Sequence, residues 1–271
     1  MIGAIIGDVV GSRFEFDNYK SKIFQFFDED SCFTDDTVMT CAVAEALMRS
    51  WDKDKFETLE EVAKYTLQDV GVWYPYCGYG AKFIKWMYSY DPQPYNSCGN
   101  GSAMRISAVG DIARSVEEAK KLAHAVTVIS HDHPEGLKGA EAVAVAIYML
   151  RHGASKKEVR EYIQDNYYDV SMKVSDLRRE TDGHGKEICQ ITVPQAFVCF
   201  FEGVSFRDVI RNCVSIGGDT DTIGAIAGGL AEAYYGVPAK DKERVMQYLD
   251  DELRAVVDGF ECFKKELRNA S

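Results

Sequence analysis

The 271-residue sequence predicts an all-α protein, and three observations support this prediction. Apolar residues recur at helical spacing, as in residues 116–129, where they form a stripe on one face. A serine or threonine followed three residues later by an acid is typical of helix N-termini. This pattern occurs at four positions, namely Thr58, Ser115, Ser155 and Ser205. Convincing strand segments with period-two alternation and hairpin turns are absent from the sequence.

Further helices are expected where apolar and alanine-rich runs continue. Their expected ranges are 36–50, 80–89, 102–114, 135–152, 193–203, 221–235 and 239–266. Irregular structure is expected near residues 16–34, 89–101 and 167–190. No linker rich in proline, glycine or serine divides the chain. We therefore expect a single domain spanning residues 1–271.

Glycines recur every fourth residue in two segments, at Gly3, Gly7 and Gly11 and again at Gly224 and Gly228. Each glycine within a helix costs about 1 kcal/mol relative to alanine, so a compensating interaction is expected. Close approach of two helix backbones would supply it. The alternative for the N-terminal segment is a strand or loop. We favour two tightly packed helices at the centre of the molecule.

Composition narrows the classes of function. The formal net charge of −12 argues against binding to a nucleic-acid backbone, which depends on clusters of Lys and Arg. The N-terminal residues lack the basic segment of a signal peptide, and the longest apolar run, 142–150, is too short for a membrane span. The eight cysteines show no C-x-x-C spacing. We expect a cytoplasmic protein without membrane contact, and nothing demands more than a monomer.

Two acidic motifs lie near opposite ends of the chain, and both precede apolar, alanine-rich runs. The first contains Asp35 and Asp36, and the second contains Asp219 and Asp221. Either motif alone would most simply cap a helix. If the motifs meet, however, two carboxylates about 4 Å apart repel by about 4 kcal/mol at an effective dielectric constant near 20. Oxygen ligands of this kind favour Mg²⁺, Mn²⁺ or Ca²⁺ over zinc.

Three further features are weaker signals when taken alone. Glu15 is a single acid that follows the first glycine-bearing segment, and on its own it indicates a surface carboxylate. Residues 96–102 are small and polar and precede an apolar run, so they could form either a phosphate cradle or a plain loop. His131 belongs to the segment Ser-His-Asp-His-Pro, whose spacing differs from that of zinc proteases.

Taken in order, five segments resemble motifs of the ADP-ribosylglycohydrolase family. These segments are Gly3–Asp8 with Gly11–Glu15, Phe33–Thr37, Gly99–Arg105, Ser130–Gly136 and Gly217–Thr222. The resemblance covers nearly the whole chain. It implies an orthogonal multi-helix bundle with two divalent cations, Mg²⁺ or Mn²⁺, at the base of a cleft.

The resemblance also implies roles for individual residues. The implied metal ligands are Glu15, Thr34, Asp35, Asp36, Asp219, Asp221 and Thr222. Glu15, Asp35 and Asp36 would take part in catalysis, with Glu15 as the base. The implied substrate-binding residues are Ser97, Gly99, Asn100, Gly101 and His131. Cys98 stands where relatives often carry an aromatic residue, which removes stacking at that position.

The implied reaction is hydrolysis at C1″ of an ADP-ribosylated protein or small-molecule conjugate, releasing ADP-ribose. One alternative is a relative that binds ADP-ribose without catalysis, although all the implied metal ligands are present. Another is an Mg²⁺-dependent all-α enzyme that processes diphosphates, such as an isoprenoid synthase. Those enzymes place a second acid three or four residues after the Asp pair, where this chain has Met39 and Thr40. The leaving group stays open, with a nucleic acid the least expected carrier.

Overall fold

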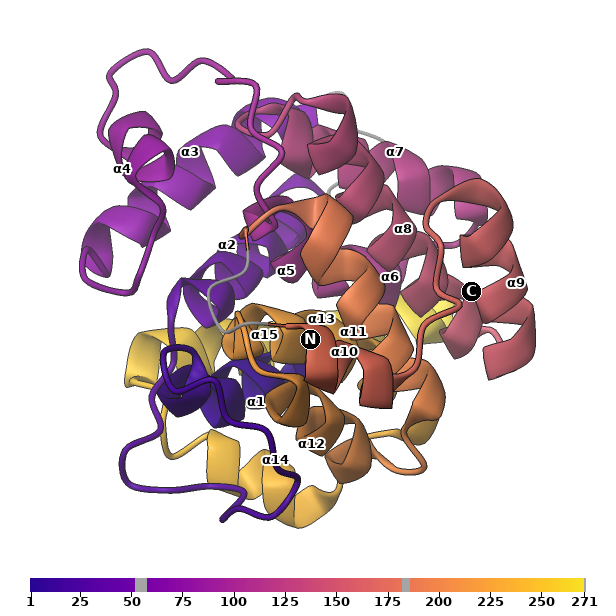
Figure 1. Cartoon of the computed structure of the whole chain (residues 1–271). Coiled ribbons are helices and arrows are strands. Elements are labelled where there is room, and N and C mark those ends of the chain that lie inside the picture. Colours follow the sequence, from indigo (N-terminus) through magenta and orange to yellow (C-terminus); the bar gives the residue numbers. More distant parts are fainter. Residues whose placement is uncertain (52–57, 182–185, 271) are drawn as a thin grey trace.

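A computed structural model describes residues 1–51, 58–181 and 186–270 (Figure 1). About 69% of the chain is helical and the described residues contain no sheet, which confirms the all-α prediction. The α-helices are α1 (Ile2–Gly11), α2 (Asp35–Ser50), α3 (Leu59–Trp73), α4 (Ala81–Met87), α5 (Gly101–Met104), α6 (Ser107–Ile112), α7 (Val116–Val128), α8 (Pro134–Arg151), α9 (Lys156–Asn166), α10 (Val174–Glu180), α11 (Cys189–Glu202), α12 (Phe206–Ile216), α13 (Thr220–Tyr235), α14 (Ala239–Val245) and α15 (Asp251–Ala270). A short 3₁₀ helix, η1 (Ser12–Phe14), follows α1.

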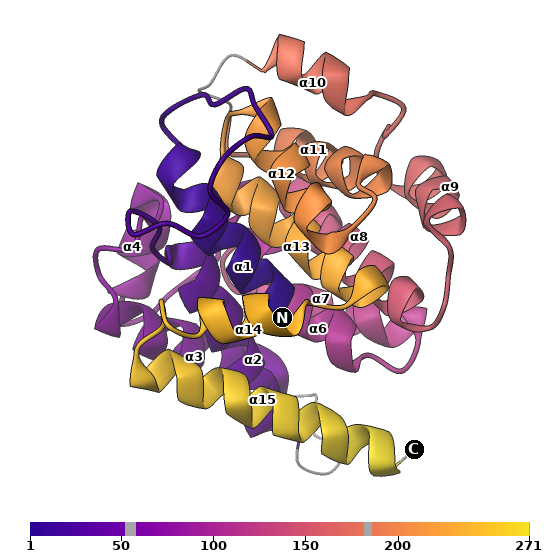
Figure 2. The same cartoon turned by 90° about the horizontal axis from the view of Figure 1, so that it is seen from below.

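Helices α1 and α13 pack against each other through their glycines near the centre of the bundle (Figure 2). A Cβ atom added at Gly3 would lie 2.3 Å from the carbonyl oxygen of Gly228, and one at Gly11 would lie 2.4 Å from that of Thr220. The Thr220 hydroxyl also donates a hydrogen bond of 2.9 Å to the Gly11 carbonyl. The predicted contact between glycine-bearing helices is thus confirmed, and the strand or loop alternative for the N-terminus is wrong.

Helices begin at the four positions where a serine or threonine is followed three residues later by an acid. Ser155 forms a complete capping box with Glu158 at the start of α9. Ser115 and Ser205 accept hydrogen bonds from backbone amides three residues ahead, at the starts of α7 and α12. Thr58 occupies the N-cap position of α3. All four patterns therefore mark the residue before a helix.

Two predicted helices are each divided in the structure. Arg105 interrupts the segment 102–114, because its backbone leaves helical values (φ −86°, ψ 0°) and its guanidinium reaches the Val126 carbonyl of α7. The segment 239–266 breaks at 246–250. There Asp250 accepts a hydrogen bond from the Leu253 amide at the start of α15, and Arg254 donates to the Met246 carbonyl.

The segment 167–190, predicted to be irregular, contains helix α10 and the first residues of α11. Helix α10 buries only Val174 and Leu177 over its two turns, so its sequence carries too little periodic signal to predict it. Helix α11 begins at Cys189, four residues before the predicted start, and it carries Pro194 within its first turns.

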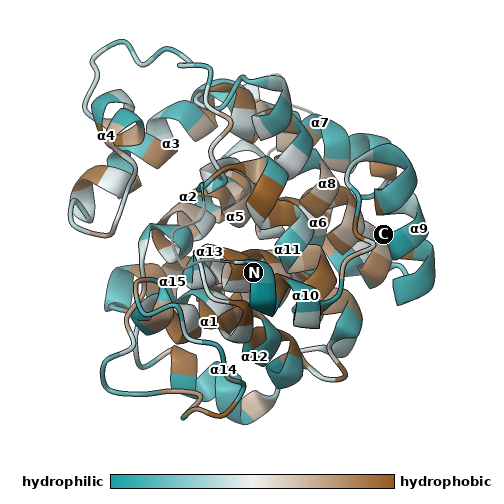
Figure 3. Ribbon diagram, viewed as in Figure 1, coloured by the Kyte–Doolittle hydropathy of each residue, from teal (hydrophilic) through white to brown (hydrophobic). Residues whose placement is uncertain are grey.

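Buried apolar side chains form one main core, with a small satellite of Ala113, Ala119 and Val145. The hydrophobic residues gather on the inner helices, whereas α9 is largely hydrophilic (Figure 3). Among the described residues, no helix is both long enough and apolar enough to cross a bilayer. The N-termini of α2 and α13 meet this core, so Asp36 and Asp221 are buried, whereas Asp35 and Asp219 are half-buried.

Candidate metal and ligand site

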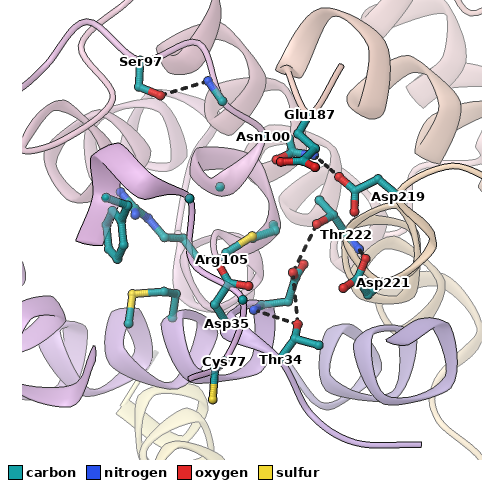
Figure 4. A pocket seen from close by; sticks show the side chains of 18 of the residues that line it. Thr34, Asp35, Cys77, Ser97, Asn100, Arg105, Glu187, Asp219, Asp221 and Thr222 are labelled. Carbon is teal, nitrogen blue, oxygen red and sulfur yellow. Dashed lines mark hydrogen bonds between the residues drawn. The ribbon is translucent and has the colours of Figure 1, made fainter. Parts of the chain in front are cut away.

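A pocket of about 430 Å³ opens where the N-termini of α2, α5 and α13 meet (Figure 4). Its volume lies in the range of small-molecule sites. Every residue that the sequence assigned to the site lines this pocket. These residues are Glu15, Thr34, Asp35, Asp36, Ser97, Gly99, Asn100, Gly101, His131, Asp219, Asp221 and Thr222. The structure therefore brings the two acidic motifs and the small-residue loop to one place.

The two acidic motifs are joined by a direct hydrogen bond. The Thr222 hydroxyl donates to Asp36 Oδ2 at 3.1 Å, across a separation of 186 residues. Thr34 caps α2 by accepting a hydrogen bond from the Asp36 amide at 3.3 Å. The capping interpretation is therefore correct for Thr34. It does not account for the carboxylates, which turn toward the pocket.

The carboxylates form two groups that share one member. In each group, oxygen atoms of three residues lie within 4.8 Å of one another. Asp8, Asp36 and Asp221 form the buried group, and Glu15, Asp219 and Asp221 form the group nearer the pocket opening. Asp35 lies beside both, with its amide bonded to the Cys77 carbonyl at 2.7 Å.

Burial and mutual repulsion disfavour the charged forms of these acids. Burial and the charge of Asp8 raise the pKa of Asp35 and of Asp36 well above the usual range. Burial and the charge of Asp219 do the same to the pKa of Asp221. The same two causes raise the pKa of Glu15 to about 7. A bound cation would reverse this balance, because it favours the ionised form of each carboxylate.

One buried atom points directly to a missing partner. Asp36 Oδ1 is shielded from solvent and has no hydrogen-bond partner among the described residues. A buried carboxylate oxygen without a partner costs free energy unless it binds a donor or a cation. Together with the all-oxygen donor set, this atom shows that the cluster fits hard divalent cations such as Mg²⁺ and Mn²⁺.

Asp8 is a member of the cluster that was not assigned to the site from the sequence. It is fully buried in α1 and accepts hydrogen bonds from the Thr34 amide at 2.9 Å and hydroxyl at 2.8 Å. It also accepts hydrogen bonds from the amide and hydroxyl of Thr37. Asp8 thereby holds the first acidic motif against α1. An acid directly after Gly7, in a helix with no other charge, was the available signal.

The small-residue loop is tied to the second acidic motif. Asn100 donates a hydrogen bond of 2.5 Å from Nδ2 to Asp219 Oδ2, so the carboxylate at the N-cap position of α13 is held from outside its own helix. Two of the loop amides are already used, since Gly99 donates to Ser97 Oγ and Asn100 to the Glu187 carbonyl, each at 3.1 Å. The loop is thus less open as an anion cradle than its composition suggested.

The opposite wall of the pocket is aromatic and carries one buried cation. His131 is buried, with its ring centroid 5.7 Å from that of Tyr95 and 6.4 Å from that of Phe83. Arg105 lies 5.8 Å from the centroid of the Phe83 ring and is also buried. The sequence did not identify Arg105, Tyr95, Phe83 or Glu187 as lining residues. Arg105 ends the motif Gly99–Arg105 but was given no role, and no local motif marks the other three.

Fold and site together define an all-helical protein whose central pocket combines a buried carboxylate cluster with a small-residue loop. Residues 1–269 match the ADP-ribosylglycohydrolase family model, and the chain belongs to this family. The resemblance found in the five sequence segments is thereby confirmed. Membership also sets aside the alternative of an isoprenoid-synthase-like enzyme.

Several characterised proteins are similar over most of the chain. An ADP-ribosylhydrolase ARH3 from Bos taurus is 26% identical, with 88% of this chain and 84% of that protein covered. The ADP-ribosyl-[dinitrogen reductase] glycohydrolase of Rhodospirillum rubrum is also 26% identical, with coverage of 95% and 92%. A solved structure titled ADP-ribosylglycohydrolase-related protein complex matches the fold with a TM-score of 0.68 and 22% identity, covering 94% of both chains.

Proposed function

We propose that this protein hydrolyses the bond at C1″ of ADP-ribosylated substrates and releases ADP-ribose, using two divalent cations, Mg²⁺ or Mn²⁺. The observation that carries this proposal is the pair of carboxylate groups that share Asp221 at the base of the pocket. Two adjacent groups of acidic side chains that share a carboxylate suit a binuclear centre. Membership of the family supplies the reaction class.

Seven residues would hold the two cations. They are Glu15, Thr34, Asp35, Asp36, Asp219, Asp221 and Thr222. When bound, the cations would orient the distal ribose and stabilise the charge that develops as the bond at C1″ breaks. Asp8 would act behind this set, because its hydrogen bonds to Thr34 and Thr37 fix the first motif.

Glu15 would act as the base. It is half-buried at the pocket edge, beside Asp219 and Asp221, whereas Asp36 and Asp221 are buried below it. A carboxylate that water can reach can take a proton from the attacking water molecule. Asp35 and Asp36 would contribute to catalysis by fixing the geometry at the base of the pocket.

The remainder of ADP-ribose would extend away from the acids. The loop Ser97–Gly101 would hold the diphosphate, and the adenine ring would pack against the wall formed by His131, Tyr95 and Phe83. The substrate would be an ADP-ribosylated protein or a small-molecule conjugate. The name of the Rhodospirillum rubrum relative gives an ADP-ribosylated protein, dinitrogen reductase, as the substrate of that enzyme.

The test is hydrolysis of a substrate panel with Mg²⁺ and Mn²⁺ compared. The panel contains ADP-ribosyl-arginine, ADP-ribosyl-serine, O-acetyl-ADP-ribose and an ADP-ribosylated nucleic acid. Loss of a general base commonly lowers kcat by about 10²- to 10⁴-fold, which is the effect expected for Glu15→Gln. Asp17→Asn is the matched control, since Asp17 is exposed nearby and does not line the pocket.

Unchanged turnover in Glu15→Gln would remove Glu15 from the mechanism. Tight binding of ADP-ribose without hydrolysis of any substrate at saturating Mg²⁺ or Mn²⁺ would identify the alternative, a non-catalytic ADP-ribose-binding relative.

A further inference from the structure

Three side chains form a buried hydrogen-bonded chain behind the aromatic wall of the pocket. Arg105 contacts Ser130 through a hydrogen bond of 2.9 Å from Nη2 to Oγ. Ser130 Oγ in turn lies 2.8 Å from Nδ1 of His131. Arg105, Ser130 and His131 are all at most 4% exposed. Nη2 of Arg105 is additionally anchored to the Val126 carbonyl at 3.1 Å, at the C-terminal end of α7.

The direction of each hydrogen bond in this chain follows from the chemistry of the groups. A guanidinium can only donate, so Ser130 Oγ accepts from Arg105. The single hydroxyl hydrogen of Ser130 has one acceptor among the described residues, namely Nδ1 of His131. If Nδ1 carried the proton instead, that buried hydroxyl hydrogen would be left without a partner, which costs about 1–3 kcal/mol.

The other ring nitrogen of His131 faces the small-residue loop. A Cβ atom added at Gly101 would lie 3.4 Å from Nε2, and one at Gly99 would lie 3.5 Å from it. Because both residues lack a side chain, the space in front of Nε2 is open to the pocket. Burial and the nearby charge of Arg105 also hold the pKa of His131 well below its usual range, so the ring is neutral.

We propose that Arg105 and Ser130 are positioning residues that fix His131 as the Nε2–H tautomer. The Nε2–H group would then donate a hydrogen bond to a phosphoryl oxygen of the substrate at the Gly99–Gly101 loop. The first statement concerns the free protein alone. The second rests on the proposed function, because it takes the diphosphate of ADP-ribose as the acceptor.

The tautomer is measured directly by two-bond ¹H–¹⁵N correlation spectra of protein labelled with ¹⁵N-histidine. His131→Gln assigns the signals of His131 among the five histidines. An unprotonated Nδ1 and a protonated Nε2 are expected in the free protein. A protonated Nδ1 would overturn the proposal. Ser130→Ala should shift the Nδ1 signal of His131, because it removes the hydroxyl donor.

Ligand binding tests the second statement. Loss of a hydrogen bond to a charged group should weaken ADP-ribose binding about tenfold in Ser130→Ala. Adenosine, which lacks phosphate, should bind this variant and the unmodified protein equally. The matched control is Ser107→Ala, since Ser107 is also buried, has no hydroxyl partner among the described residues and does not line the pocket.

The possible results separate the inference from the proposed function. Equal weakening of ADP-ribose and adenosine binding in Ser130→Ala would give Arg105 and Ser130 a structural role only. It would overturn the proposed hydrogen bond from His131 to the phosphate. If Ser107→Ala changed the His131 spectrum as much as Ser130→Ala does, the proposed control of the His131 tautomer by Arg105 and Ser130 would be overturned. If no ADP-ribosylated substrate is hydrolysed while the tautomer and the ADP-ribose effect are found, the proposed function fails and the inference stands.

Discussion

The backbones of Gly7 and Gly224 are in direct contact, and a Cβ atom on Gly7 would lie 1.9 Å from the Gly224 carbonyl oxygen. No real Cβ atom approaches a carbonyl oxygen so closely, and the neighbour is backbone that has no rotamer to change. Helix α1 carries Asp8 and leads to Glu15, while α13 carries Asp221. This contact therefore sets the spacing between the carboxylates that the site requires.

Gly7→Ala should destabilise the protein and weaken cation binding together. Overpacking usually costs about 1–3 kcal/mol, and a clash with backbone belongs at the upper end. Gly259→Ala in α15 is the matched control. Its added Cβ would meet nothing closer than 3.8 Å, so alanine should stabilise that helix by up to about 1 kcal/mol. Urea unfolding measures both variants, and an equal stability change in the two would contradict the packing argument.

Asp221→Asn should affect stability and activity in opposite directions. Removal of one of several repelling buried carboxylates should make the metal-free protein more stable. Hydrolysis should fall by at least about 100-fold, because both carboxylate groups lose their shared oxygen ligand. Thermal unfolding in EDTA and in Mn²⁺, combined with the hydrolysis assay, measures both effects. A variant that keeps the full rise in Tm on adding Mn²⁺ would exclude Asp221 as a ligand.

Metal-free protein should lose stability as the pH rises from about 4 to about 7. Burial raises the pKa of Asp8 from 3.8 to about 6, and burial with the charge of Asp219 raises the pKa of Glu15 from 4.5 to about 7. In this window the folded state binds more protons than the unfolded state, so the free energy of unfolding falls with rising pH. Asp8 alone would contribute on the order of 2 kcal/mol.

Saturating Mg²⁺ should reduce or reverse that pH dependence. Cations bind the deprotonated carboxylates, so their stabilising effect grows as the pH rises. Urea unfolding at pH 5 and pH 8, in EDTA and in Mg²⁺, provides the comparison. Identical slopes with and without Mg²⁺ would show that the cluster binds no cation.

Asp111 should be important for stability and not for chemistry. It is buried and paired with Arg151 and, at 3.3 Å, with Lys264. Burial alone would raise its pKa, but the Met1 amino group, Arg151 and Lys264 outweigh burial and hold the pKa below the usual range. Its contribution is therefore present above about pH 4 and is lost as the pH falls further.

Asp111→Asn should lower the free energy of unfolding by about 3–5 kcal/mol, since it removes the fully buried carboxylate from this group of ion pairs. Among the described residues, the Met1 amino group and Arg151 then keep only Glu232, and Lys264 keeps only Glu261. Glu161→Gln is the matched control. The Lys157–Glu161 pair is largely exposed, and such pairs contribute about 0.3–0.5 kcal/mol. Comparable losses in the two variants would show that burial adds nothing to the Asp111 pairs.

The central pair of helices and the meeting of the acidic motifs could be predicted because their signals repeat locally. Glycines at every fourth residue cost free energy unless helices touch, and the motifs at Asp35 and Asp219 directly precede the helices that they begin. The helix ends that were predicted wrongly depend on contacts between residues far apart in the sequence. Arg105 ends a helix in order to reach Val126, and nothing adjacent in sequence signals that partner.

The candidate site shows the same division. Residues within motifs, such as Asp221 and Asn100, line the pocket, and their roles there stay predictions. Asp8 was quoted within a motif but not assigned to the site, because its role depends on accepting hydrogen bonds from Thr34 and Thr37. Glu187 approaches Asp219 from a segment that was predicted to be irregular, so its place at the pocket required the structure.

The contact between α1 and α13 also determines when the site can exist during synthesis. The Gly11 carbonyl and the Thr220 hydroxyl that it binds are 209 positions apart, so nearly the whole chain must emerge before they meet. Synthesis proceeds at about 5–20 residues per second, so α13 is completed at least about ten seconds after α1. Any cation bound at this site could therefore stabilise only the completed protein, and it could not guide the early folding of the N-terminal half.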